Sequence, residues 1–116
     1  MADLLVDTDV FVDHLRGARR IQPSRERILY SVVTRCELFA GREVEEAIVQ
    51  RLLAPFEEVS VDRPVAERAG RLRRGGGMRT PDALIAATAL ENELVLVTRK
   101  ARDFRPVRGL KLRSGI

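Results

Sequence analysis

Three acidic residues, Asp7, Glu37 and Asp82, lie within or directly beside apolar segments that are expected to be buried. Glu37 lies four residues after Val33 and three before Ala40, on the side of a predicted helix that should pack inward. Asp82 lies in the first turn of a strongly apolar helix, and Asp7 directly follows a short apolar run. Burying a lone carboxylate is costly unless a cation, a metal ion or hydrogen bonds compensate it. If the three acids converge, a shared divalent cation would compensate them together.

Each acid also has a less specific explanation. Asp82 could interact with the dipole and free N–H groups of its helix N-terminus, and Glu37 could form a salt bridge with Arg35 or Arg42. The segment Asp7–Asp9 could be a helix-capping cluster. The three acids together indicate a metal site more strongly than any one of them alone, because acids at the ends of separate elements can meet at one edge of a sheet.

The composition limits the kind of metal site and protein. Cys36 is the only cysteine among 116 residues, which excludes a zinc site of several thiolates and leaves oxygen ligands or His14. Oxygen ligands favour Mg²⁺ or Mn²⁺. The length predicts a single domain, 1–116. We expect a cytoplasmic protein with no membrane contact, because no apolar run approaches the length of a membrane span.

Alternating strand and helix patterns predict the elements that would position the acids. Strands are expected at 2–6, 28–30, 56–61, 94–97 and 107–112, and helices at 8–17, 32–40, 43–53, 63–74 and 80–91. This order predicts an α/β fold with an open, mostly parallel sheet covered on both faces. Ligands bind such sheets beyond the carboxyl ends of the strands, where Asp7, Ser31, Asp62 and Thr98 would lie.

The charge is positive and carried mostly by arginine. The chain has 21 Lys and Arg against 17 Asp and Glu, and only Lys100 and Lys111 are lysines. Arginines flank the glycines 75–77, and a second basic stretch covers 99–113. Arginine suits phosphate because its planar group donates paired hydrogen bonds, although basic loops can also serve solubility alone.

Four segments in order carry a resemblance to a known family: 6–17 (VDTDVFVDHLRG), 31–41 (SVVTRCELFAG), 80–89 (TPDALIAATA) and 96–99 (LVTR). They resemble the PIN-domain ribonucleases, and most of all the VapC toxins of prokaryotic toxin–antitoxin pairs. The resemblance implies a three-layer α/β/α sandwich and a Mg²⁺- or Mn²⁺-dependent endoribonuclease acting on structured RNA such as tRNA or rRNA. It also implies a VapB-type antitoxin as partner, and a homodimer for which a face at Val44, Ile48 and Leu52 is available.

The family's acids map onto this chain with one departure. Asp7, Glu37 and Asp82 match the first three, as catalytic residues and metal ligands. Lys100 stands where the family commonly has an Asp or Asn, so either Asp103 takes the fourth role or the site lacks its fourth acid. Asp9 could assist.

The predicted mechanism follows from charge. A metal ion would activate a water for attack on the scissile phosphate and offset the growing negative charge, and Thr8 and Thr98 are candidate hydroxyl partners of the acids. Because an acidic site repels RNA, surrounding cations are needed. The candidate RNA-binding residues are Arg71, Arg73, Arg74, Arg79, Arg99 and Arg102.

Two alternatives remain at this point. A receiver-like signalling domain would use Asp7, Asp9, Asp62, Thr98 and Lys100 around one Mg²⁺. A PIN-like domain that binds RNA or its antitoxin with weak or no cleavage is the other, with the Lys100 amine in the place of a second metal.

Overall fold

The fold is a parallel five-stranded sheet between two layers of helices. The computed structural model describes residues 3–22, 25–42 and 45–116. Its strands are β1 (Asp3–Val6), β2 (Arg27–Ser31), β3 (Glu57–Val59), β4 (Val95–Val97) and β5 (Leu112–Arg113). Its helices are α1 (Thr8–Leu15), α2 (Val32–Phe39), α3 (Glu46–Leu53), α4 (Arg63–Arg74), α5 (Thr80–Glu91) and α6 (Ala101–Phe104). The strand order is β3-β2-β1-β4-β5 with all pairs parallel, so β1 is the central strand and Asp7 leaves the middle of the sheet.

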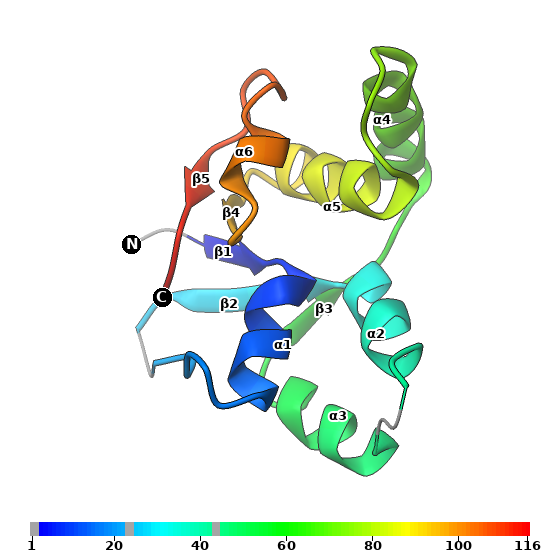
Figure 1. Cartoon of the computed structure of the whole chain (residues 1–116). Coiled ribbons are helices and arrows are strands. Elements are labelled where there is room, and N and C mark those ends of the chain that lie inside the picture. Colours follow the sequence, from blue (N-terminus) through cyan, green and yellow to red (C-terminus); the bar gives the residue numbers. More distant parts are fainter. Residues whose placement is uncertain (1–2, 23–24, 43–44) are drawn as a thin grey trace.

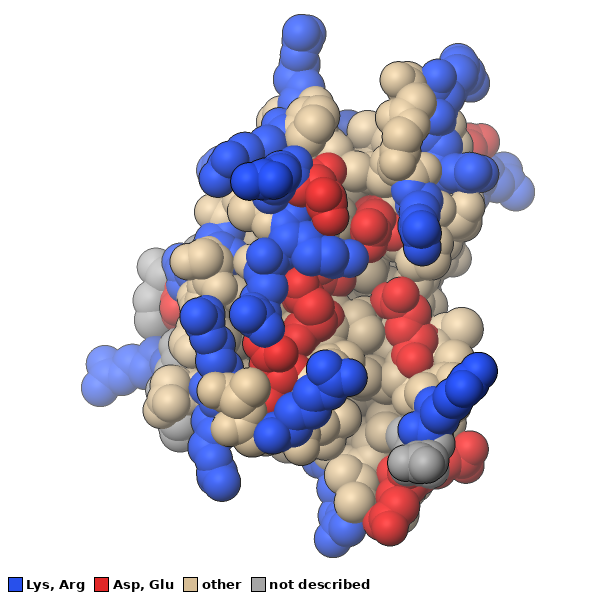
Figure 2. All heavy atoms as spheres, in the orientation of Figure 1, with Lys and Arg blue, Asp and Glu red and all other residues tan. Residues whose placement is uncertain are grey.

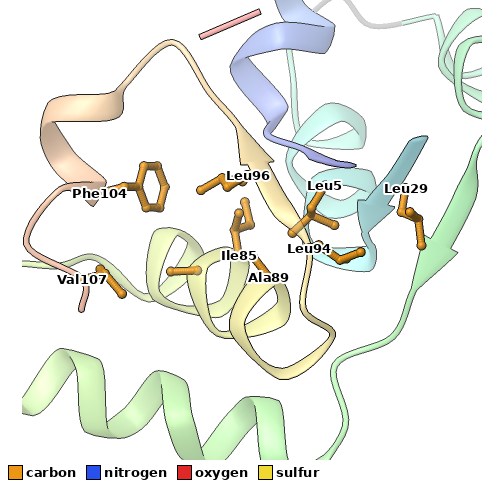
Figure 3. Packing of buried hydrophobic residues seen from close by; sticks show 9 residues of the cluster. Leu5, Leu29, Ile85, Ala89, Leu94, Leu96, Phe104 and Val107 are labelled. Atoms are coloured by element: carbon orange, nitrogen blue, oxygen red, sulfur yellow. The ribbon is translucent and has the colours of Figure 1, made fainter. Parts of the chain in front are cut away.

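Alternate residues of the central strands build two cores, one on each face of the sheet. Leu5 and Leu96 belong to a cluster with residues of α5 and α6, including Ile85 and Phe104 (Figure 3). Leu4, Val6 and Val97 face the other way, toward α1, α2 and α3. Figure 1 shows these two helical layers on opposite sides of the sheet. The predicted α/β/α sandwich is confirmed.

Short polar side chains at or shortly after strand ends cap three of the helices. Asp7, Ser31 and Asp62 are the N-caps of α1, α2 and α4, and each accepts a hydrogen bond from a backbone N–H of the first turn. The predicted burial of α5 is also found, with six of its residues in the core. These short connections fix the first turns of α1 and α2 at the carboxyl edge of the sheet.

The C-terminal region differs from the prediction. The expected strand at 107–112 is reduced to β5, because α6 and a turn through Gly109 (φ 83°) precede it. The strand predicted at 56–61 is only three residues long. Helix α3 begins at Glu46 rather than at 43, because Glu45 is its N-cap in an extended conformation. Residues 43 and 44 (Glu43 and Val44), like Ala2, lie outside the described residues.

The strand order excludes the receiver-like alternative. That architecture needs Asp62 beside Asp7 and Thr98, but β3 is an edge strand and β2 separates it from β1. Asp62 instead caps α4, accepting from the Val65 backbone N–H at 3.1 Å.

Candidate active site

Asp7 is the innermost acid of the site. It is 1% exposed, its Oδ1 accepts from the Thr8 backbone N–H at 2.8 Å, and its Oδ2 accepts from the Thr98 hydroxyl at 2.8 Å. Burial, followed by the nearby charge of Asp9, raises the pKa of Asp7 to about 7 even though these hydrogen bonds and Lys100 act in the opposite direction. The carboxylate of Asp7 therefore lies in surroundings that compensate its charge only in part.

Glu37 reaches the same edge through a chain of hydroxyls. The Thr8 hydroxyl donates to Glu37 Oε1 at 2.6 Å, and the hydroxyl of Thr34 lies 2.9 Å from that of Thr8. Thr34 is fully buried one helical turn before Glu37. Thr8, at the start of α1, thereby fixes an acid of α2 beside the end of β1, and Thr34 supports the Thr8 hydroxyl as a positioning residue.

Asp9 adds another carboxylate beside Asp7. Its Oδ2 accepts from the Arg99 backbone N–H at 3.1 Å, while its Oδ1 is buried and has no hydrogen-bond partner within the described residues. Burial raises the pKa of Asp9, opposed by the hydrogen bond from Arg99 and the charge of Lys100. An unpaired buried carboxylate oxygen is costly, and its position at this edge makes it available to a cation.

Asp82 enters the site from α5 and is paired with Lys100. The Lys100 ammonium donates to Asp82 Oδ1 at 2.9 Å and lies 5.8 Å from the centre of the Phe104 ring. The structure therefore places Asp82 at the edge of the site. Its partner there is Lys100, the residue that stands in place of the fourth acid.

Asp103 lies further out, in the first turn of α6, and is exposed. It lines a cavity of about 660 Å³ between α4, α5 and α6, which we call the arginine cleft. Its charged lining residues are Arg71, Arg79, Asp82, Arg102, Asp103 and Arg108. Asp82 belongs to both the inner acid group and the cleft, so the two are continuous.

The predicted RNA-binding arginines do not all lie in this cleft. Arg71, Arg79 and Arg102 line it, whereas Arg73 donates to the Met78 carbonyl oxygen at 3.4 Å and Arg74 is exposed at the end of α4. The Arg99 guanidinium forms an ion pair with Asp13, a buried residue of α1. Figure 2 shows acidic side chains gathered on this face with basic side chains around them.

The donor set fits a hard divalent cation. All the candidate donors are oxygens, Asp9 Oδ1 has no hydrogen-bond partner among the residues that the structure describes, and the charge of Asp7 is incompletely compensated. His14 is occupied elsewhere, since its Nδ1 accepts from the Ile21 backbone N–H at 3.0 Å. Within the described residues, no three acidic, His or Cys side chains already surround one point.

Comparison with known proteins decides the family. The model of the PIN domain family matches residues 4–110. This chain belongs to the PIN-domain family. Ribonuclease VapC10 of Mycobacterium tuberculosis is 37% identical, over 93% of this chain and 90% of its own length.

Solved structures agree with this assignment of the PIN domain. A toxin–antitoxin complex from Klebsiella pneumoniae is 30% identical, with a TM-score of 0.75 over 93% of this chain and 95% of that one. A DNA-bound VapBC from Salmonella typhimurium shares the fold at a TM-score of 0.84 and 23% identity, covering 97% of this chain and 98% of that one. The described residues of this PIN domain include no helix of the length and apolarity that a membrane span requires.

Proposed function

We propose that this VapC-type PIN domain is a Mg²⁺- or Mn²⁺-dependent endoribonuclease and the toxin of a toxin–antitoxin pair. The observation that carries the proposal is the position of Asp7, which is buried at the end of the central strand with its charge only partly compensated. Beside it, Asp9 has a buried oxygen without a partner among the described residues. Structural carboxylates are normally satisfied, so a buried, undercompensated pair at a ligand-binding edge supports a cation site.

The residues that would hold the ion are Asp7, Glu37 and Asp82, with Asp103 as a fourth. When bound, the ion would supply an activated water and offset the charge that grows on the phosphate. Thr98 holds Asp7, and Thr8 holds Glu37, so that neither acid needs to reorganise during the reaction. An acid of this set would accept the proton of the attacking water.

RNA would enter along the arginine cleft. Arg71, Arg79 and Arg102 line it next to Asp82, which places cations for the phosphates beside the acids. The only tyrosine, Tyr30, is buried and the chain has no tryptophan, so stacking surfaces for bases are scarce. Recognition through phosphates and shape favours a structured RNA, for which tRNA and rRNA are the candidates.

A VapB-type antitoxin is the proposed partner, because the Klebsiella pneumoniae and Salmonella typhimurium relatives were solved as toxin–antitoxin complexes. A homodimer stays a prediction. Of its proposed face, Ile48 is 39% exposed and Leu52 is partly buried, while Val44 lies outside the described residues. A cytoplasmic location, where RNA is the available substrate, belongs to the same proposal.

A second candidate function is binding of RNA or antitoxin without efficient cleavage. The observation in its favour is the Lys100 ammonium at Asp82, where a cation of the protein takes the place that a metal ion would need.

The test is cleavage of total RNA and of tRNA by antitoxin-free protein with Mg²⁺, Mn²⁺ or EDTA. Cleavage that requires metal and is lost in Asp7→Asn supports the nuclease. The matched control is Asp3→Asn, which changes an exposed acid at the other end of the same strand. Absence of cleavage with both metals, while tRNA still binds, would favour the second candidate.

A further inference from the structure

We propose that Lys100 is a built-in cation of the active site, which takes the place of a second divalent ion so that the acid group binds a single Mg²⁺ or Mn²⁺. This inference rests on the proposed metal-dependent nuclease. It assigns a role to Lys100, which stands where the PIN-domain family commonly has an Asp or Asn.

The backbone fixes Lys100 to the same hydroxyl that holds Asp7. Its N–H donates to Thr98 Oγ1 at 3.0 Å, and that hydroxyl donates to Asp7 Oδ2 at 2.8 Å. The ammonium then reaches Asp82 at 2.9 Å and lies against the Phe104 ring. Lys100 is therefore held by three contacts: its backbone N–H to Thr98, its ammonium to Asp82, and the same ammonium to the Phe104 ring.

The charge of Lys100 acts on three carboxylates from two separate parts of the chain. It lowers the pKa of both Asp7 and Asp9, in addition to its contact with Asp82. Burial disfavours the charged ammonium, yet the hydrogen bond to Asp82 and the charges of Asp7, Asp82 and Asp9 together raise the pKa of Lys100. Lys100 is therefore charged at neutral pH.

The position of the Lys100 ammonium favours one divalent ion over two. It lies 2.9 Å from Asp82 Oδ1, so that oxygen already has a cation as its partner. A second ion would have to enter beside a fixed ammonium and compete with it for Asp82. An isolated surface ion pair would contact Asp82 alone, whereas Lys100 is also joined to Asp7 through its backbone N–H and the Thr98 hydroxyl.

The experiment is a Mn²⁺ titration of the purified full chain, followed by isothermal calorimetry and by the electron paramagnetic resonance signal of free Mn²⁺. The variants are Lys100→Met, which removes the charge, and Lys100→Arg, which keeps it. Lys111→Met is the matched control, because Lys111 is the other lysine of the chain and is exposed.

We expect one Mn²⁺ per chain for the wild type. In Lys100→Met the first ion should bind at least about tenfold tighter, equivalent to about 1.4 kcal/mol, because the repulsion is gone and Asp82 is released. Lys100→Arg and Lys111→Met should bind like the wild type. Lys100→Gln, which keeps a donor for Asp82 without the charge, gives the same test if Lys100→Met does not fold.

Two ions in the wild type, or an unchanged Kd in the neutral variants, would overturn the role of Lys100 and leave the nuclease standing. Absence of Mn²⁺ binding in every folded chain would overturn the metal-dependent nuclease together with this inference.

Discussion

The Thr98 hydroxyl donates to Oδ2 of Asp7 at 2.8 Å, and both side chains are buried at the carboxyl edge of the sheet. The two residues are 91 positions apart in the sequence. They meet because β1 and β4 pair in parallel, with Val6 opposite Val97. This bond is the main support of the innermost acid.

Removing the hydroxyl should therefore destabilise the metal-free protein. We expect Thr98→Val to lower the free energy of unfolding at pH 8 by about 1–3 kcal/mol, since the ionised Asp7 loses a buried donor. Urea denaturation in EDTA measures this change. Thr98→Ser keeps the hydroxyl and should stay near the wild type, and equal stability of the Val and Ser variants would refute the argument.

Asp7 should also make stability depend on pH. Its pKa is about 7 in the folded chain, against about 3.9 in an unfolded one. Between these values the folded state binds more protons than the unfolded state, so this contribution stabilises the fold at low pH and is lost as pH rises through 7. The loss amounts to about 4 kcal/mol at most.

Asp7→Asn removes that titration. In EDTA it should be more stable than the wild type at pH 8, with the advantage shrinking at pH 5, as measured by urea denaturation at both values. Added Mn²⁺ at pH 8 should stabilise the wild type more than the variant. A stability difference that is the same at pH 5 and pH 8 would show that Asp7 is not the group responsible.

The sequence was sufficient to predict most of the fold because its signals are local. Asp7 and Ser31 are capping residues at the ends of β1 and β2, Asp62 is one three residues after β3, and the apolar pattern of α5 is typical of a buried helix. The C-terminal region carried weaker signals. A four-residue helix such as α6 is too short to show a helical period, so the sequence does not predict it, and the turn after it falls within the expected edge strand at 107–112.

The acids could be predicted, but not their partners. Asp7, Glu37 and Asp82 are conspicuous because each interrupts an apolar pattern. Which cation each one meets depends on contacts between distant segments. Arg99 was proposed for RNA, yet it pairs with Asp13, 86 residues away, and only the pairing of β1 with β4 brings the two together.

The arginine cleft predicts how RNA affinity depends on salt. In an Asp7→Asn background, which should not cut, Arg71→Ala and Arg102→Ala should each weaken RNA binding. Each should also reduce the slope of log K against log salt by about 0.7–0.9, the value for one phosphate contact. Arg51→Ala on α3 lies outside the cleft and should leave the slope unchanged. A loss of affinity with no change in slope would indicate that these arginines do not contact phosphates.

The role of Asp103 can be separated from that of Asp82 by comparing their Asn variants. Asp103 is exposed and lines the cleft, whereas Asp82 lies in the inner group with Lys100. We expect Asp103→Asn to slow RNA cleavage about tenfold, equivalent to about 1.4 kcal/mol in the barrier, and Asp82→Asn to slow it further, because an outer ligand contributes less than an inner one. Initial rates at saturating Mn²⁺ measure both. Cleavage by Asp103→Asn at the wild-type rate would mean that the site works without a fourth acid.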